Sequence, residues 1–318
     1  MPLQYDPEFA ELAAPVLQLV SQAERPAIHD IDTRRANLDA FSSQATATAQ
    51  IPNDVEQIVH YARTADNHDV PMLHFRRKNT LPSGPGPAIV HMHGGGFIAL
   101  SAAIGTPSLS RFVSETGVQI LSIDYRLAPE NIFPKPLDDC WTALTWIHGH
   151  AHELSIDNSR IAVMGESAGG SLAAGLTLLA RDRGLSPPLA KQILVYPMLD
   201  DRTRTNPFGD LAFWSAEDNV TGWTAYLGAS AAAKSVSPYA APARVNSVQG
   251  LPPLYLDCGQ IDVFALEDVR YVLRFMEANI PAELHVYEGL PHGFEGFAPT
   301  SGAVKQAFAN RARAIISF

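Results

Sequence analysis

A serine between two glycines, placed between a strand and a helix, constrains this chain more than any other stretch. Residues Arg160–Met164 form a short apolar run that predicts a buried strand. Ser167 follows, flanked by Gly165 and Gly169, and an Ala- and Leu-rich run to about Arg181 predicts a helix. This order is typical of a nucleophile elbow, a strained turn that projects the serine hydroxyl clear of the sheet. The alternative is that a helix starting close beneath a sheet needs small residues there.

The composition indicates a globular protein without basic or membrane-spanning segments. The 318 residues suffice for one large α/β domain with an added subdomain, or for two domains. Hydrophobic residues make up 46%, which supports a sizeable core, and the net charge of −10 disfavours nucleic acid and anionic membranes as partners. No apolar run is long enough to span a bilayer, and the start resembles no secretory signal. Cys140 and Cys258 fit neither a zinc site nor a disulfide framework, so we expect a reduced, cytoplasmic protein.

The order of predicted elements indicates a mostly parallel sheet. Residues 57–63 and 70–76 predict an antiparallel hairpin, after which short apolar strands alternate with helices. Strands of this kind are buried on both faces by the helices that connect them. The further predicted strands are Ala88–Met92, Val118–Asp124, Gln192–Tyr196, Leu254–Asp257 and Glu283–Tyr287, and the helices are Leu137–His148, Leu266–Ala278 and 301–316.

Two segments depart from this alternation. Residues 1–50 combine short helical patterns with prolines and predict a helical flap with a flexible hinge. Residues 202–235 place aromatic side chains among polar ones and predict an inserted helical piece. The core is then expected to comprise residues 51–201 and 236–318.

A glycine-rich loop follows the strand that ends at Met92. Gly94, Gly95 and Gly96 allow the backbone to pass close to a reacting atom and aim its N–H groups there, as an oxyanion requires. The spacing Gly94-x-Gly96-x-x-Ala99, with Asp124 ending the next strand, also mimics a dinucleotide fingerprint. Against that alternative, Gly105-Thr106-Pro107 prevents a prompt helix, and the chain contains no Tyr-x-x-x-Lys pair.

Two groups of histidines invite a metal site, but neither has the necessary ligands. His91-x-His93 would need further His or carboxylate ligands, and His148, His150 and His152 lack an HExxH pattern. We expect no metal and no cofactor.

A serine nucleophile needs a base and an acid that orients the base. His292 lies in a tight turn after the last predicted strand, between Pro291 and Gly293, whereas His285 lies inside that strand and is expected to be structural. The candidate acids follow two successive strands: Asp200, Asp201, Asp257 and Asp262. Asp262 is favoured because its loop lies at the same end of the sheet as Ser167, but the pattern alone does not decide.

Four motifs together resemble the hormone-sensitive-lipase family of α/β-hydrolases, which includes bacterial and fungal carboxylesterases and arylacetamide deacetylases. They extend from about Pro87 to the C-terminus in the expected order: His93-Gly-Gly-Gly-Phe97, Asp124-Tyr-Arg-Leu-Ala-Pro-Glu130, Gly165-Glu-Ser-Ala-Gly-Gly170 and Pro291-His-Gly-Phe294. The resemblance implies the α/β-hydrolase fold and a carboxylic ester hydrolase with Ser167 as nucleophile, His292 as general base and acid, and Asp262 as its orienter. It also implies oxyanion donors on the amides of Ala168 and of Gly94–Gly96, with Gly95 and Gly96 favoured.

The resemblance has two departures and leaves alternatives open. Glu166 stands where Asp is commoner, and Asp262-Val-Phe lacks the usual proline, which keeps Asp257 as an alternative acid. Plant gibberellin receptors share the fold without hydrolysing anything, but they fail at the catalytic histidine, which this chain keeps as His292. Amide or lactone hydrolysis also stays open.

The family implies a helical cap, built from residues 1–50 and 202–235, over a site for short-to-medium acyl or aryl esters. Five aromatic residues could line the substrate pocket or equally form the core of the cap: Phe97, Phe213, Trp214, Trp223 and Tyr226. Family members often dimerise through the last strand of the sheet, so a homodimer is also expected.

Overall fold

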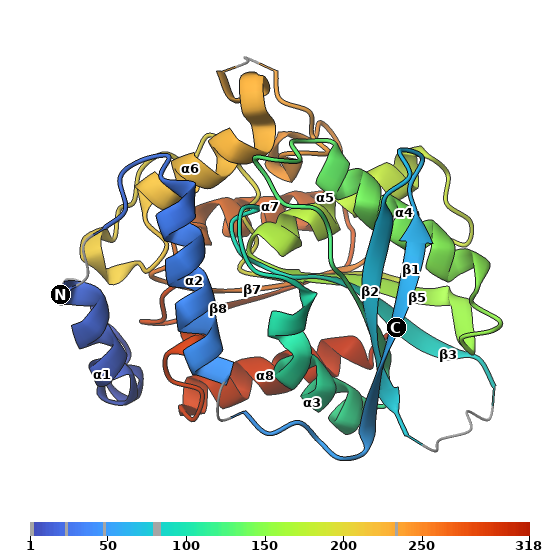
Figure 1. The fold of residues 1–318 in the computed structure, drawn as a ribbon, viewed down its shortest axis with the longest axis horizontal. Helices are drawn as coiled ribbons and strands as arrows, with labels where there is room; N and C mark the ends of the chain where they lie inside the picture. The colour runs from blue at the N-terminus through green and yellow to red at the C-terminus, as the bar shows by residue number, and fades with distance from the viewer. Residues whose placement is uncertain (1–2, 23–24, 47–48, 79–83, 233–234) are drawn as a thin grey trace.

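An eight-stranded sheet forms the centre of the molecule (Figure 1). The structure, a computed structural model, describes residues 3–22, 25–46, 49–78, 84–232 and 235–318. The strands are β1 (Val55–Arg63), β2 (Asp69–Arg77), β3 (Gly86–Met92), β4 (Gln119–Ile123), β5 (Ile156–Glu166), β6 (Lys191–Val195), β7 (Leu254–Gly259) and β8 (Ala282–Tyr287). Their order is β1-β2-β4-β3-β5-β6-β7-β8, with β1, β2 and β4 paired antiparallel and all other neighbours parallel.

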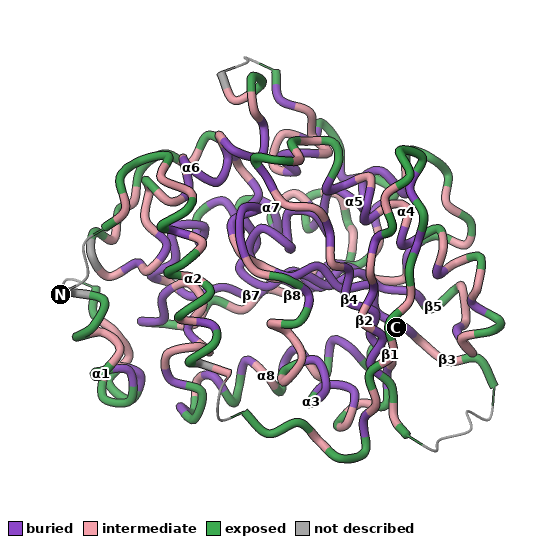
Figure 2. The backbone as a smooth tube through the Cα atoms, in the orientation of Figure 1, coloured by how far each residue is buried: buried purple, intermediate pink, exposed green. Residues whose placement is uncertain are grey.

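Helices cover both faces of this sheet. The helices in the described part of the chain are α1 (Pro7–Gln22), α2 (Ile31–Thr46), α3 (Thr106–Thr116), α4 (Lys135–Gly149), α5 (Ala168–Asp182), α6 (Ala216–Leu227), α7 (Ala265–Glu277) and α8 (Gly302–Ile315). Figure 1 shows α3 and α8 on one side of the sheet and α4, α5 and α7 on the other. The central strands are therefore buried, as their purple colour in Figure 2 shows. None of the described helices is long and apolar enough to cross a bilayer.

The predicted hairpin and the predicted alternation of strands and helices are confirmed, with boundaries that differ by a few residues. The exception is α3, in a segment where no helix was predicted and where Gly105-Thr106-Pro107 was interpreted as a break. Helix α3 begins at Thr106, with Pro107 in its first turn. Proline suits this position because its fixed φ fits a helix and the first-turn N–H has no intrahelical acceptor. The break thus marks the start of a helix.

The N-terminal helices and the insertion lie next to each other. Residues 202–235 contain α6 and short 3-10 turns, at Gly209–Leu211 before it and Gly228–Ala232 after it. Arg34 on α2 binds Asp218 on α6, with 2.7 Å between Nε and Oδ1. The backbone N–H of His29 donates to Thr221 Oγ1 at 3.1 Å, and Tyr5 Oη donates to the Leu211 carbonyl at 2.7 Å. The two segments that depart from the strand–helix alternation thus hold each other in place.

Candidate active site

Ser167 occupies a strained turn between β5 and α5. Its φ of 56° and ψ of −120° lie in a region that side chains rarely adopt. The flanking glycines are required by close backbone approach. A Cβ on Gly165 would lie 2.3 Å from the Gly169 carbonyl oxygen, and a Cβ on Gly169 would lie 2.1 Å from the Met92 carbonyl oxygen. The local geometry is therefore that of the predicted nucleophile elbow.

The structure brings His292 and Asp262 together with Ser167. His292 Nε2 lies 2.9 Å from Ser167 Oγ, and His292 Nδ1 lies 2.6 Å from Asp262 Oδ2. Because an ionised carboxylate can only accept, Nδ1 carries the proton, and Nε2 is left to accept from the serine hydroxyl. Asp262 is held in turn by the backbone N–H of Phe264, which donates to Oδ1 at 2.9 Å. The chain order Ser, Asp, His and these contacts match a nucleophile–base–acid relay.

The other candidate acids have different partners. Asp257 is fully buried and binds Arg311 through both carboxylate oxygens, at 2.7 and 2.8 Å. Asp201 pairs with Arg244, and Asp200 pairs with Arg202. Of the four aspartates weighed from the sequence, the structure brings Asp262 to the histidine.

The glycine-rich loop after β3 lies beside the elbow. Gly95 has φ of 115°, and a Cβ there would lie 2.1 Å from the Ala99 carbonyl oxygen. Gly96 has φ of 60°, and a Cβ there would lie 2.4 Å from the ring of Trp214. Both positions therefore require glycine, for conformation and for space.

Several amides of this region are free to donate. Among the described residues, the backbone N–H groups of Gly95, Gly96 and Ala168 have no hydrogen-bond acceptor. Ala168 is the first residue of α5, so its amide also belongs to the positive end of the helix dipole. Gly94 is held through its carbonyl, which accepts from His93 Nδ1 at 2.7 Å. The loop and the helix start together offer donors to a developing negative charge.

The paired histidines at the end of β3 are engaged in hydrogen bonds. His91 Nδ1 lies 2.8 Å from Ser122 Oγ, and its Nε2 lies 2.7 Å from Glu166 Oε2. Burial acts to raise the pKa of Glu166, but His91, together with Arg311 and a backbone hydrogen bond, outweighs burial and lowers that pKa. His93 stacks on Tyr125, and burial lowers its pKa to about 4. No group of three or more His, Cys, Asp or Glu side chains in the described ranges is arranged to hold a metal.

Dinucleotide binding was the alternative weighed for the glycine-rich loop, because its glycine spacing is followed by Asp124 at the end of the next strand. Asp124 Oδ1 accepts from the backbone N–H of Ala102 at 2.8 Å and so holds the turn before α3. This contact gives Asp124 a structural role.

The five aromatic pocket candidates divide into two groups. Phe97, Trp223 and Tyr226 are at most 1% exposed and pack together, with the Phe97 and Tyr226 rings stacked at 4.0 Å. They therefore form core, the alternative interpretation. Trp214 lies over Gly96 with its ring 6.5 Å from that of His292, whereas Phe213 stacks on Phe297 at 3.6 Å.

Two residues near the site were not singled out from the sequence. Arg35 on α2 donates to the Ile98 carbonyl at 2.6 Å and pairs with Glu130, so it ties α2 to the glycine-rich segment. Tyr196, at the end of β6, packs edge-on against His292 at 4.7 Å. The positive φ of Tyr196, 35°, has no signal in the sequence.

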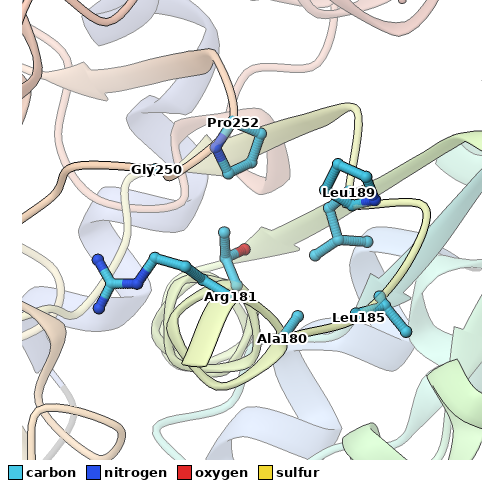
Figure 3. Close-up of a pocket in the computed structure, with 8 residues that line it drawn as sticks. Ala180, Arg181, Leu185, Leu189, Gly250 and Pro252 are labelled. Carbon is cyan, nitrogen blue, oxygen red and sulfur yellow. The ribbon is translucent and has the colours of Figure 1, made fainter. Parts of the chain in front are cut away.

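Two cavities differ in their relation to the site. A cavity of about 480 Å³ lies between α2 and the segment after the glycines, within the size range of ligand pockets. Its lining residues are Arg35, Asp39, Ser42, Ser43, Thr46, Ala99, Leu100, Ser101, Ala103, Ile104 and Leu127. A second cavity of about 20 Å³ lies where α5 ends, at Ala180 and Arg181 (Figure 3), and has room for about one water. Ser167 lies directly before the first residue of α5, whereas this small cavity lies at the other end of the helix, so the cavity is remote from Ser167.

Comparison with known proteins identifies the family. A model described as alpha/beta hydrolase fold matches residues 89–296. Esterase LipI of Mycobacterium tuberculosis is 31% identical over 226 residues, 70% of this chain and 69% of that protein. Ethyl acetate hydrolase of Pseudomonas putida is 27% identical and covers 83% of each chain. A solved structure of a bacterial heroin esterase aligns with a TM-score of 0.90 and 36% identity, over 98% of this chain and 97% of that one. The chain therefore belongs to the alpha/beta hydrolase fold family, and the predicted class of carboxylesterase is confirmed.

Proposed function

We propose that this chain hydrolyses carboxylic esters through an acyl-enzyme on Ser167, with His292 as general base and acid and Asp262 as its orienter. The observation that carries the proposal is the continuous contact from Ser167 Oγ to His292 Nε2, at 2.9 Å, and from His292 Nδ1 to Asp262, at 2.6 Å. A hydroxyl is a weak nucleophile at neutral pH, so a base within hydrogen-bond reach is what its chemistry requires.

The reaction proceeds in two half-reactions. Ser167 Oγ attacks the ester carbonyl while His292 Nε2 takes its proton, and Asp262 stabilises the imidazolium that forms. The tetrahedral intermediate then expels the alcohol, which receives the proton from His292. Water attacks the acyl-enzyme with the same histidine as base, and the acid leaves as Ser167 is regenerated.

The negative oxygen of the tetrahedral intermediate is assigned to the amides of Gly95, Gly96 and Ala168. Their lack of other acceptors supports this role. Gly94 serves the same loop through its carbonyl, which fixes the peptide plane that carries the Gly95 amide. No metal or cofactor takes part in these steps.

The N-terminal segment, residues 1–50, and the insertion, residues 202–235, form the cap over this site. The ion pair between Arg34 and Asp218 and the contact of Trp214 with Gly96 support a single unit that reaches the glycine-rich loop. Part of the substrate occupies the cavity of about 480 Å³ beside that loop, a size suited to short-to-medium acyl or aryl esters. Trp214 does not line that cavity but lies over Gly96, so it is the aromatic candidate retained for the part of the substrate site at the glycine-rich loop.

We also propose that this esterase forms a homodimer whose interface lies at β8. β8 is an edge strand, and the neighbouring α7 exposes a row of apolar side chains: Leu266, Val269, Leu273 and Met276. Replacing Leu273 and Met276 by Glu is expected to yield monomer in light scattering, whereas a monomeric wild type would contradict the dimer.

The two free, buried cysteines support a reducing compartment such as the cytoplasm.

The test of the activity is a series of nitrophenyl esters from acetate to palmitate, with wild type and Ser167→Ala. We expect turnover by the wild type, greatest for the shorter chains, and a loss of about 10⁶-fold in kcat for the variant. Turnover that persists in Ser167→Ala contradicts the serine mechanism. Binding of esters by a wild type without turnover supports the receptor alternative.

A further inference from the structure

A buried cation contacts the loop that carries the candidate base and has no role in the reaction described above. Arg311, on α8, is 6% exposed. Its Nε and Nη2 donate to the two carboxylate oxygens of Asp257, at 2.7 and 2.8 Å, and its Nη1 donates to Glu295 Oε1. One guanidinium therefore joins the end of β7 to the loop that carries His292.

Glu295 lies three residues after His292 and connects back to it through Tyr196. Gly293, between them, has φ of 64°, which turns the chain so that both side chains reach the same region. Tyr196 Oη donates to Glu295 Oε2 at 3.2 Å, and the Tyr196 ring meets the His292 ring at 4.7 Å with an interplanar angle of 68°. Arg311 thus fixes Glu295, Glu295 fixes Tyr196, and the Tyr196 ring packs against the imidazole.

The charges of this group do not cancel. One guanidinium faces two carboxylates, so the group formed by Arg311, Asp257 and Glu295 carries a net negative charge. Burial alone would lower the pKa of Arg311, but the two carboxylates outweigh it and raise that pKa. Burial, with Glu295 nearby, raises the pKa of Tyr196, so its hydroxyl keeps the proton that it donates.

Other ionisable groups also surround the base. Asp262 contacts it directly, and Glu166, paired with His91, precedes the nucleophile. On α7, burial raises the pKa of Glu267 to about 8 and that of Asp268 well above its usual range. Of these surroundings, Glu295 is the carboxylate on the same loop as His292.

We propose that Arg311 and Glu295 are positioning residues for His292, which fix the imidazole and set how readily it takes up a proton. The proposal rests on the proposed function, in which His292 is the base. The two residues have separable effects. The two-pronged contact of Arg311 with Asp257 holds the loop of His292 in position, and the carboxylate of Glu295 adds a negative charge near the imidazole. A purely structural support would lower activity equally at every pH.

Two variants separate these effects. Glu295→Gln keeps an oxygen that can accept from Tyr196 but removes the charge, so the acid limb of the kcat/KM profile should move to lower pH by about half a unit. Arg311→Lys keeps the charge but loses the two-pronged contact with Asp257, so kcat should fall about tenfold with KM and the acid limb unchanged. Glu283→Gln is the matched control because Glu283 pairs with Arg313, an exposed arginine on the same helix.

The profiles are measured with nitrophenyl acetate, and the imidazole titration of His292 is followed by NMR in wild type and Glu295→Gln. A downward shift of that titration, absent in Glu283→Gln, supports the proposal. An unmoved titration, or a loss of kcat in Arg311→Lys no larger than in the control, overturns it. If Arg311→Lys does not fold, the Glu295→Gln titration decides alone. The NMR result is independent of turnover, so its failure is distinct from turnover that persists in Ser167→Ala, which contradicts the proposed function itself.

Discussion

The end of β7 and the loop that follows it place two aspartates five residues apart in very different surroundings. Asp257 and Asp262 are both fully buried. Asp257 faces the guanidinium of Arg311 and the hydroxyl of Tyr255, whereas Asp262 faces the imidazole of His292 and the N–H of Phe264. Burial is the same, so the two aspartates differ in their partners: a permanent cation makes an ion pair with Asp257, and a titratable ring gives Asp262 its proposed role as the orienter of the base.

The largest expected effect comes from removing the charge of Asp262. Asp262→Asn should lower kcat about 10³–10⁴-fold, because the amide no longer favours the tautomer in which Nε2 accepts from Ser167. Substrate binding should change little, so KM stays close to that of the wild type. Steady-state kinetics with nitrophenyl acetate measure both constants. If Asp257→Asn instead caused the greater loss of kcat, the assignment of the two aspartates would have to be exchanged.

The second effect is on stability, and here the larger loss is expected for the variant of Asp257 rather than for that of Asp262. Asp257→Asn leaves the guanidinium of Arg311 buried without its main counterion and should lower the free energy of unfolding by about 3–5 kcal/mol. Asp262→Asn leaves no permanent cation without its counterion and should cost about 1 kcal/mol. Urea unfolding followed by tryptophan fluorescence measures both. Equal losses would show that the partner does not distinguish the two sites.

The sequence predicted much of this arrangement because strands, turns and motifs are local. The strand before the elbow follows from an apolar run and the helix after it from an Ala- and Leu-rich run, and the required glycines follow from the strained turn at Ser167. The choice between Asp257 and Asp262 could only be favoured, since the partner of Asp257 lies 54 residues away on α8. A signal for that partner exists: Arg311 falls at helical spacing between Ala307 and Ala314, on the buried side of α8.

Other features had weaker signals or none. The start of α3 was missed because glycine and proline are ambiguous: they can break a helix or begin one. The division of the aromatic candidates depends on tertiary packing, which places Phe97 against Tyr226 and Trp214 over Gly96. Residue type alone gives an aromatic side chain equal reason to lie in a core or a pocket.

A third buried carboxyl, that of Glu267, sharpens the comparison, because no cation in the described part of the chain forms an ion pair with it. Glu267 Oε1 accepts from the backbone N–H groups of Leu199 and Asp200, yet burial outweighs these bonds and raises the pKa of Glu267 to about 8. Unfolded, this pKa is about 4.5, so the folded state holds an extra proton between these values. The contribution of Glu267 to stability is therefore complete below pH 4.5 and is lost as the pH rises through about 8.

The corresponding prediction compares the wild type with Glu267→Gln, in which the carboxyl is replaced by a neutral amide. Between pH 6 and 8.5, the free energy of unfolding of the wild type should fall by about 2 kcal/mol more than that of Glu267→Gln. Glutamine keeps an oxygen for the two backbone donors and does not titrate. Urea unfolding at a series of pH values measures the difference. Parallel curves for the two proteins would mean that Glu267 is ionised in the folded state throughout this range.

The smallest effect is expected for an ion pair that resembles that of Asp257 in chemistry but lies at the surface. Glu56 and Arg76 face each other across β1 and β2, with 2.7 Å between Oε1 and Nε and with side chains 37% and 45% exposed. Water and salt screen such a pair, so Glu56→Gln should lower the free energy of unfolding by less than about 1 kcal/mol. The loss should shrink further in 1 M salt, where the screening length is about 3 Å, whereas that of Asp257→Asn should persist. A loss of several kcal/mol at Glu56 would show that an Arg–carboxylate contact stabilises this protein irrespective of burial, and the contrast between Asp257 and Asp262 would then need another cause.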